Sequence, residues 1–204
     1  MEVRGARSLD EVNLAYELAA KIYGPNYFDA QFNLTRVRDL EPLQNLEDLI
    51  VIADNHQILG MVRILDRELY SPAGIIKAGG ITSVCVHPTL RGQGWGLRIM
   101  ETALTRSSKR GDSISVLFAR RAVDDWYPKL GYVGIGCHPE LTLDESSASR
   151  LFPPSQASFR TGVVSENIAI YEQAYQSTYE KLFLSMMRTK KWWQTLDQRL
   201  AGRV

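Results

Sequence analysis

The chain has 204 residues, 45% of them hydrophobic, so it is long enough to bury the core of one ordinary domain with an appended element. The 24 lysines and arginines nearly cancel the 23 aspartates and glutamates, and the formal charge of +1 offers no basic surface for nucleic acid. No apolar stretch approaches the ~20 residues needed to cross a bilayer, and the polar N-terminus predicts no signal peptide. Cys85 and Cys137 lack the spacing of a disulfide framework or a zinc site, and we expect a cytoplasmic protein.

The N-terminal segment predicts a helix that follows a short strand. Ser8 and Glu11 fit a capping box, in which Ser8 is the N-cap and the Glu11 side chain reaches back. The helix ends near Gly24-Pro25, and residues 27–38 fit a second helix or an ordered loop. The positions that this first helix turns inward are Val12, Ala15, Ala19 and Ile22.

Runs of β-branched and apolar residues predict the strands between residues 2 and 87. Turns at residues 54–56 and 71–74 separate them, so the middle runs form a hairpin. Gly79 and Gly80 lie in the middle of the last run and indicate a bulge or a close backbone approach. The expected strands are residues 2–6, 49–53, 58–65 and 75–87.

The stretch from Val84 to Leu97 carries the strongest functional signal. An apolar run ends at Pro88, a turn with one arginine and three alternate glycines follows, and an amphipathic helix then runs to about Arg110. A glycine-rich turn at a helix N-terminus presents unpaired N–H groups and the positive end of the helix dipole to an anion. The turn therefore predicts a pyrophosphate site, although such a turn by itself is often only a tight turn.

The spacing of the glycines excludes two common phosphate motifs. No Gly-Lys-Ser/Thr closes a P-loop, and Gly92, Gly94 and Gly96 do not fit G-x-G-x-x-G. Instead Arg91 begins Arg-x-x-Gly-x-Gly directly after Val-x-Val-x-Pro, which resembles the acetyl-CoA-binding motif of the GNAT N-acetyltransferases. Residues 126–132, Trp-Tyr-Pro-Lys-Leu-Gly-Tyr, resemble the second signature of that family. Two motifs in the family's order are far more specific than either alone.

The rest of the chain predicts a mixed sheet. Residues 113–118 form the next strand, residues 124–130 a short helix ended by Gly131, and residues 132–137 a returning strand. A strand, helix and strand in succession make a parallel βαβ unit. We therefore expect an α/β fold whose central twisted mixed sheet has helices on both faces, and the resemblance implies the GNAT-type acyl-CoA N-acyltransferase fold.

Beyond residue 138 the composition changes to a loop rich in proline and serine, with one more strand expected at 161–164. Residues 165–167 then cap a helix whose tyrosine stripe (Tyr171, Tyr175, Tyr179) fits helix–sheet packing better than a stacking surface for an acceptor. This helix and the Arg-x-x-x-Trp-Trp segment that begins at Arg188 resemble the enhanced-intracellular-survival acetyltransferases, whose members are about twice as long. We expect a GNAT core at 1–145, an extension at 146–164 and a helical extension at 165–204.

The resemblance assigns roles to both motifs. It implies direct transfer of an acetyl group from acetyl-CoA to an amine, with the Val86 N–H stabilising the oxyanion and Tyr127 protonating the leaving thiolate. No metal is implied. The residues implied to hold acetyl-CoA are Val84, Cys85, Val86, Arg91, Gly92, Gln93, Gly94, Trp95, Gly96 and Leu97.

Several alternatives remain open on the sequence. Tyr127 also fits simple packing beside Trp126; Cys85 fits a buried strand residue better than a nucleophile, and His87 fits a loop histidine. The general base is unassigned, because a solvated face explains Asp124, Asp125, Glu140 and Asp144 equally well. The aromatic residues near Asp29 fit the lining of an acceptor pocket and also an ordinary core: Tyr23, Tyr27, Phe28, Phe32 and Trp126. A small amine is the favoured acceptor; a protein lysine or N-terminal amine, or a non-catalytic acyl-CoA-binding module, is the alternative. The C-terminal helices would suit a homodimer contact.

Overall fold

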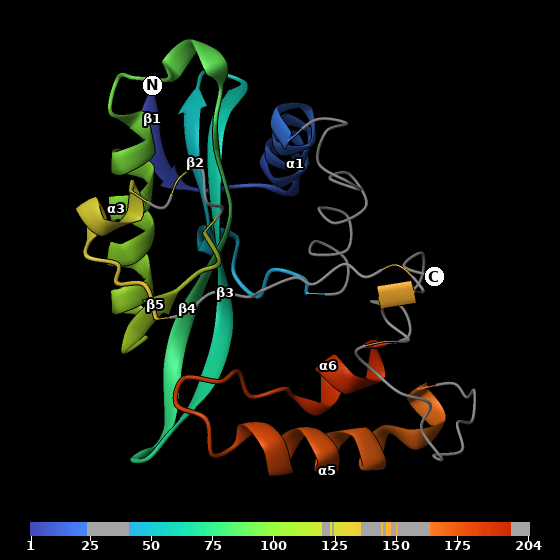
Figure 1. Ribbon diagram of the computed structural model, residues 1–204. Helices are drawn as coiled ribbons and strands as arrows, with labels where there is room; N and C mark the ends of the chain where they lie inside the picture. The colour runs from blue at the N-terminus through green and yellow to red at the C-terminus, as the bar shows by residue number, and fades with distance from the viewer. Residues whose placement is uncertain are drawn as a thin grey trace.

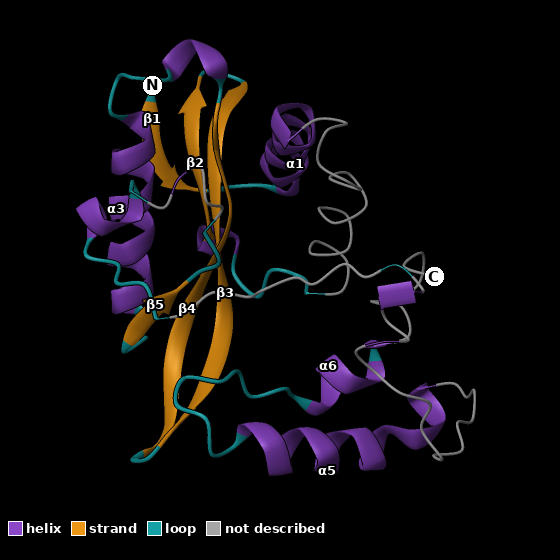
Figure 2. Ribbon diagram, viewed as in Figure 1, coloured by secondary structure: helices purple, strands orange, loops and turns teal. Residues whose placement is uncertain are grey.

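The described part of the protein is built around a five-stranded mixed sheet (Figure 2). The computed structural model describes residues 1–23, 41–119, 123, 125–135, 144, 146–147, 150 and 164–196. Four strands pair antiparallel in the order of the chain, and the fifth lies parallel to the fourth, which confirms the predicted fold class. The strands are β1 (Glu2–Gly5), β2 (Leu49–Asp54), β3 (Gln57–Ser71), β4 (Gly74–Val86) and β5 (Ile114–Val116).

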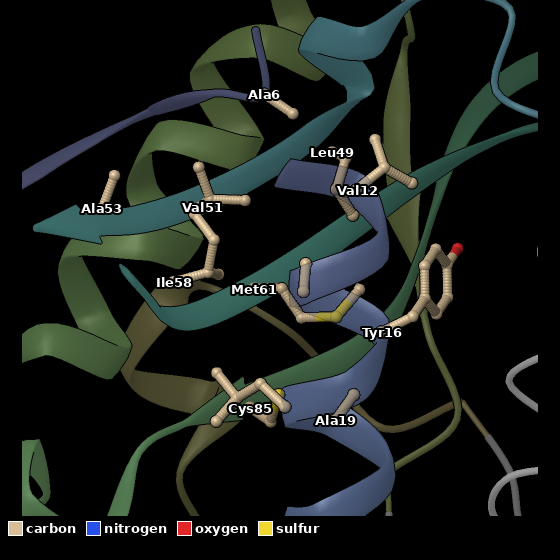
Figure 3. Packing of buried hydrophobic residues seen from close by; sticks show 12 residues of the cluster. Ala6, Val12, Tyr16, Ala19, Leu49, Val51, Ala53, Ile58, Met61 and Cys85 are labelled. Atoms are coloured by element: carbon tan, nitrogen blue, oxygen red, sulfur yellow. The ribbon is translucent and has the colours of Figure 1, made fainter. Parts of the chain in front are cut away.

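Helices cover both faces of the sheet. Helix α1 (Leu9–Tyr23) lies on one face and α3 (Trp95–Lys109) on the other (Figure 1). Because successive side chains of a strand point to opposite faces, β2 contributes to both cores. Leu49 and Val51 pack with α1, whereas Ile50 and Ile52 pack with α3. Figure 3 shows the first cluster, in which side chains of α1 point toward those of β2, β3 and β4.

The start of α1 is capped almost as the sequence predicts. The Glu11 N–H donates to Ser8 Oγ at 3.2 Å, while the Glu11 carboxylate accepts from the N–H of Arg7 rather than from that of Ser8. Arg4 holds the same carboxylate at 2.7 Å and, with the Arg7 N–H, lowers its pKa to about 2. The start of α1 is therefore held by Arg4 of β1 as well as by its own cap. It ends at Tyr23, and Gly24 lies outside the described residues.

The C-terminal extension lies beside the far end of the β3–β4 hairpin (Figure 1). Helices α5 (Ile168–Tyr179) and α6 (Lys190–Gln194) flank a segment that bonds to the edge of β3. There the Leu184 N–H donates to the Tyr70 carbonyl, the Tyr70 N–H to the Ser185 carbonyl and the Met187 N–H to the Glu68 carbonyl, at 2.9, 2.9 and 2.7 Å. β2 ends its pairing at Arg63, so this part of the β3 edge is open to the extension.

Two predicted strands differ from the structure. β5 is three residues long rather than six, and residues 132–135, expected to begin a strand, are irregular; residues 136–137 lie outside the described part. β5 pairs with β4 only through Ala78, Gly79 and Gly80, and within the described residues neither segment pairs with β4 beyond that point. The strand expected at 161–164 lies outside the description except for Val164, which is in a 3-10 helix. At Gly79, β4 approaches α3 closely, as the sequence predicts for Gly79 and Gly80: a Cβ on Gly79 would lie 2.1 Å from Ser107 Oγ.

Candidate functional site

The glycine turn makes an open N-terminus for α3. Gly92 and Gly94 have positive φ angles of 75° and 82°, which glycine adopts without a Cβ penalty. Gly94 is the N-cap and its carbonyl accepts from the N–H groups of Leu97 and Arg98 at 3.1 and 3.2 Å. Within the described residues no backbone acceptor receives the N–H groups of residues 92–96, and no acidic residue lies in the first helical turn. These outward donors at the positive end of the helix suit an anion.

Among the residues that the structure describes, no strand pairs with β4 beyond Gly80 on the side away from β3. We call this part of β4 its open edge. A bulge interrupts the β3–β4 pairing where Ser83 has a φ of +56°, and Met61 then pairs with Cys85. The His87 N–H donates to the Leu59 carbonyl at 2.8 Å. Because backbone groups alternate in direction along a strand, those of Cys85 also face β3, whereas those of Val84 and Val86 face the open edge. The Val86 N–H thus points toward the open edge of β4.

Cys85 and His87, the two nucleophile or base candidates of this strand, have other surroundings. Cys85 is 5% exposed and packs in the α1 cluster, and burial raises the pKa of its thiol to about 12. A neutral, buried thiol is a poor nucleophile. His87 caps the 3-10 helix η2 (Pro88–Leu90), with its Nδ1 2.7 Å from Thr89 Oγ1. Both arrangements favour the structural interpretation of these side chains.

The second motif folds against the first. Tyr127 begins the 3-10 helix η4 (Tyr127–Leu130), which Gly131 ends in the left-handed conformation (φ +83°). The ring of Trp126 lies so close to α3 that a Cβ on Gly96 would be 3.3 Å from it. Tyr127 stands edge-on to Trp126 and to Tyr132, at centroid distances of 5.0 and 5.7 Å. Side chains of both motifs and of the open edge pack on one buried cluster: Val84, Val86, Trp95, Trp126, Tyr127 and Tyr132.

Charge at this end of α3 is positive. Arg91 is exposed, and Arg98 lies over the ring of Trp95 at 4.4 Å from its centroid, a cation–π contact that holds the guanidinium close to the turn. Gln93 donates to the Thr89 carbonyl at 2.8 Å and thereby braces the turn. The structure thus gathers two arginines, open N–H groups and a helix N-terminus on one surface.

On the α1 side the structure describes few of the proposed acceptor residues. The Tyr23 hydroxyl donates to the Val84 carbonyl at 2.8 Å, so the end of α1 touches the open edge. Residues 27, 28, 29 and 32 lie outside the described part, as do Asp124 and Glu140. Asp125 and Asp144 are exposed, and the Ser147 N–H, followed by the Ser147 and Ser146 side chains, lowers the pKa of Asp144. A carboxylate with a lowered pKa is a weak base, and the general base stays unassigned.

One buried charge was not predicted. Arg63 is 2% exposed in the middle of β3 and donates to Tyr16 Oη at 2.7 Å and to the Glu41 carbonyl. The only signal in the sequence is an arginine between Val62 and Ile64 in an apolar run. A cavity of about 520 Å³ opens beside it, between β3 and the C-terminal extension, and its charged lining includes Glu41, Arg67 and Lys191. It is separate from the open edge of β4.

The comparison of sequences identifies the class of protein to which this fold and site belong. The profile of the acetyltransferase (GNAT) domain matches residues 2–134. The chain belongs to the GNAT acetyltransferase family. Among curated proteins no sequence matches it.

Solved structures share the fold. A GCN5-related N-acetyltransferase from Anabaena variabilis has a TM-score of 0.69 at 20% identity, over 96% of this chain and 47% of its own. Eis1 from Mycobacterium abscessus has a TM-score of 0.65 at 19% identity, over 99% of this chain and 49% of its own. A predicted acetyltransferase with acetyl-CoA from Clostridium acetobutylicum has 0.55 at 22%, over 69% of this chain and 95% of its own. The chain therefore spans about half the length of the first two.

Two kinds of feature are absent from the described residues. No helix there is both long and apolar enough to cross a membrane. No group of three or more histidine, cysteine, aspartate or glutamate side chains is placed there to hold a metal ion.

Proposed function

We propose that the protein transfers the acetyl group of acetyl-CoA to a primary amine, with a small-molecule acceptor favoured. The observation that carries the proposal is that the β4 edge at Val84–Val86, Trp95 of the glycine turn and the ring of Tyr127 pack on one cluster. The N–H groups at Gly92–Gly96 lie in the same turn, and no backbone acceptor receives them within the described residues. Each element answers one chemical need of the reaction.

The donor would lie along the open edge. The N–H groups of the turn and Arg91 would bind the pyrophosphate, and the side chain of Trp95 and the backbone up to Leu97 would border it. The pantetheine amides would then extend the sheet as an added strand on Val84 and Val86, in the place that β5 leaves empty. Gln93 would keep the turn in shape. Cys85, whose backbone faces β3, would contribute packing only.

The chemistry needs a stabilised oxyanion and a proton for the leaving group. The amine nitrogen attacks the thioester carbonyl carbon, the Val86 N–H holds the developing oxyanion, and the C–S bond breaks as the intermediate collapses. Tyr127 donates its hydroxyl proton to the leaving thiolate. The proton that the amine loses replaces the one that Tyr127 gives to the thiolate. The products are an acetamide and the free thiol of CoA.

The experiment pairs binding with turnover. Calorimetric titration with acetyl-CoA tests the donor site, and release of CoA thiol is then followed with spermidine, tyramine, glucosamine 6-phosphate and a lysine peptide. Transfer to one of the first three supports a small acceptor, and transfer to the peptide alone supports a protein acceptor. Binding without release supports a non-catalytic module. Absence of acetyl-CoA binding contradicts the proposal.

Tyr127→Phe tests the acid. We expect kcat to fall about 100-fold with an unchanged dissociation constant for acetyl-CoA. Tyr132→Phe is the matched control, because its hydroxyl bonds to Ser115 Oγ in the same aromatic group and takes no part in the proposed chemistry. Full turnover in the Tyr127 variant would reject the assignment.

Three expectations from the sequence belong to the same proposal. A cytoplasmic location would give the enzyme its acetyl-CoA, and a homodimer would use the C-terminal helices. The division into a core at 1–145, an extension at 146–164 and a helical extension at 165–204 is the domain organisation that we propose.

A further inference from the structure

His87 stands where the open edge of β4 passes into the glycine turn. Its N–H donates to the Leu59 carbonyl of β3 at 2.8 Å, and its carbonyl accepts from the Leu90 N–H of η2 at 2.9 Å. The backbone of this residue is therefore fixed to the sheet on one side and to η2 on the other. Its side chain projects from that fixed position toward the turn.

The imidazole caps the first amide of η2. Pro88 begins this short helix and has no N–H, so Thr89 supplies the first amide that needs an acceptor. The Thr89 N–H donates to His87 Nδ1 at 3.4 Å, and Thr89 Oγ1 lies 2.7 Å from the same nitrogen. A ring nitrogen that accepts from an amide carries no proton, which places the proton of the neutral ring on Nε2. His87 thus serves as an N-cap through its acceptor at Nδ1.

The same contact continues into the glycine turn. The Thr89 carbonyl accepts from Gln93 Nε2 at 2.8 Å. Gln93 lies between Gly92 and Gly94, both of which have positive φ angles. Glycine loses more conformational freedom on ordering than any other residue, so a turn built on two glycines needs contacts from outside to keep one shape. His87, Thr89 and Gln93 form a chain of hydrogen bonds that supplies such contacts.

The shape that this chain holds is the one that the donor would need. Within the described residues no backbone acceptor receives the N–H groups of residues 92–96. These groups can bind a pyrophosphate together only while the turn holds them in place. A turn that samples other shapes has a smaller competent fraction, and the apparent dissociation constant rises in proportion. The cap at Nδ1 should therefore affect the affinity for the donor and leave the chemistry at the thioester unchanged.

We propose that His87 is a positioning residue of the donor site: its Nδ1 accepts from Thr89 and, through Gln93, holds the glycine turn in its phosphate-binding shape. This inference rests on the proposed function and gives the histidine a role other than that of a base. The role requires an acceptor at this one atom and not the rest of the ring. Asparagine separates the two requirements, because its Oδ1 is attached to Cγ as Nδ1 is and asparagine is a preferred N-cap residue.

The test is calorimetric titration of three His87 variants with acetyl-CoA. His87→Ala removes the acceptor, and His87→Phe keeps a ring without one. In both variants we expect the dissociation constant to rise about five- to tenfold, as for one lost cap, whereas His87→Asn should stay within twofold of wild type. With an amine that the wild-type protein acetylates, the KM for acetyl-CoA should rise in the first two variants, while kcat and the KM for the amine stay within twofold.

Two further variants control for stability and for the chain of hydrogen bonds. Ser8→Ala removes the cap of the Glu11 N–H on α1, so it should lower the melting temperature and leave the acetyl-CoA dissociation constant unchanged. Gln93→Ala interrupts the chain at its other end. Its effect on affinity and that of His87→Ala should be less than additive in the double variant. Full additivity would mean that the two side chains act independently and would overturn the chain.

The outcomes separate the inference from the function on which it rests. Unchanged acetyl-CoA affinity in His87→Ala and His87→Phe overturns the role of His87 and leaves the proposed function standing. Equal losses in His87→Asn and His87→Ala also overturn it, because the acceptor would then not be the group that matters. A fall in kcat without a loss of affinity overturns it as well and would indicate a base. Wild-type protein that does not bind acetyl-CoA overturns both.

Discussion

Helices α3 and α5 are of similar length but are held in different ways. α3 (15 residues) buries Ile99, Met100, Ala103 and Ser107 against the sheet, whereas α5 (12 residues) has no buried residue. α5 instead contributes Tyr175, which stacks on Tyr179 at 4.4 Å between centroids and meets Trp193 edge-on at 5.6 Å. The core is thus stabilised by apolar burial, and the extension by an aromatic cluster and a few backbone hydrogen bonds.

The proposed catalytic residues belong to the region that apolar burial stabilises. In the C-terminal extension, Arg188 is the centre of the aromatic cluster. Its guanidinium lies 4.1 Å from the ring centroid of Tyr175 and 4.0 Å from that of Trp192. Trp193, 3% exposed, is the buried member of this cluster. Loss of the cluster should release the extension, whereas loss of a core residue should unfold the whole domain.

Ile99→Ala is the change from which we expect the largest effect. Ile99 has no exposed surface in α3, so its truncation leaves a cavity and should lower the free energy of unfolding by about 2–5 kcal/mol. Urea denaturation followed by circular dichroism measures it. Thr105→Ala, at an exposed position of the same helix, is the control and should cost little. An equally small effect of both would contradict the description of α3 as a core helix.

Trp193→Ala should separate the two regions. We expect residues 164–196 to become sensitive to protease while the urea midpoint of the sheet shifts little, because the core clusters do not contain this ring. Limited proteolysis with mass spectrometry locates the cuts, and Gln194→Ala at the exposed neighbouring position is the control. Global unfolding in the tryptophan variant would show that the extension is part of the core.

Gly94→Ala tests the turn that begins α3. At φ +82° an added Cβ meets no atom within 4 Å, so the cost is backbone strain of about 1 kcal/mol, and the reshaped turn should bind acetyl-CoA more weakly. Gly111→Ala is a close control, since Gly111 has φ +83° and equal space at the other end of α3. Both should lose similar stability, measured by thermal denaturation. Equal acetyl-CoA affinity in the two variants would argue against a phosphate site at Gly94.

The smallest effect concerns the Arg4–Glu11 pair. The pKa of Glu11 is lowered from 4.5 to about 2, so its stabilising contribution is complete above pH 4.5 and is lost as the pH falls toward 2. Near the surface such a pair contributes about 1 kcal/mol. Glu11→Gln should therefore be less stable than wild type at pH 7, and the difference should shrink by pH 3 in urea titrations. A difference that does not change with pH would assign the effect to the cap alone.

The sequence was informative where a structure depends on neighbours in the chain. The capping box at Ser8, the end of η4 at Gly131 and the change from strand to helix around Gly94 are local features, since turn chemistry and periodicity act over a few residues. The two motifs also identified the family without any information on folding. The returning strand expected from Tyr132 was wrong over its described residues, because a strand needs a partner edge and its own sequence does not supply one.

Tertiary structure alone decided which distant groups meet. The bond from Tyr23 to Val84, the contact of Arg63 with Tyr16 and the pairing of Met187 with Glu68 join segments that no local pattern relates. The amino-acid sequence by itself thus determined the class of fold and the glycine turn. The open edge of β4, and the tyrosine beside it, exist only because the pairing of β5 with β4 ends at Gly80 and the fold brings the end of α1 to Val84.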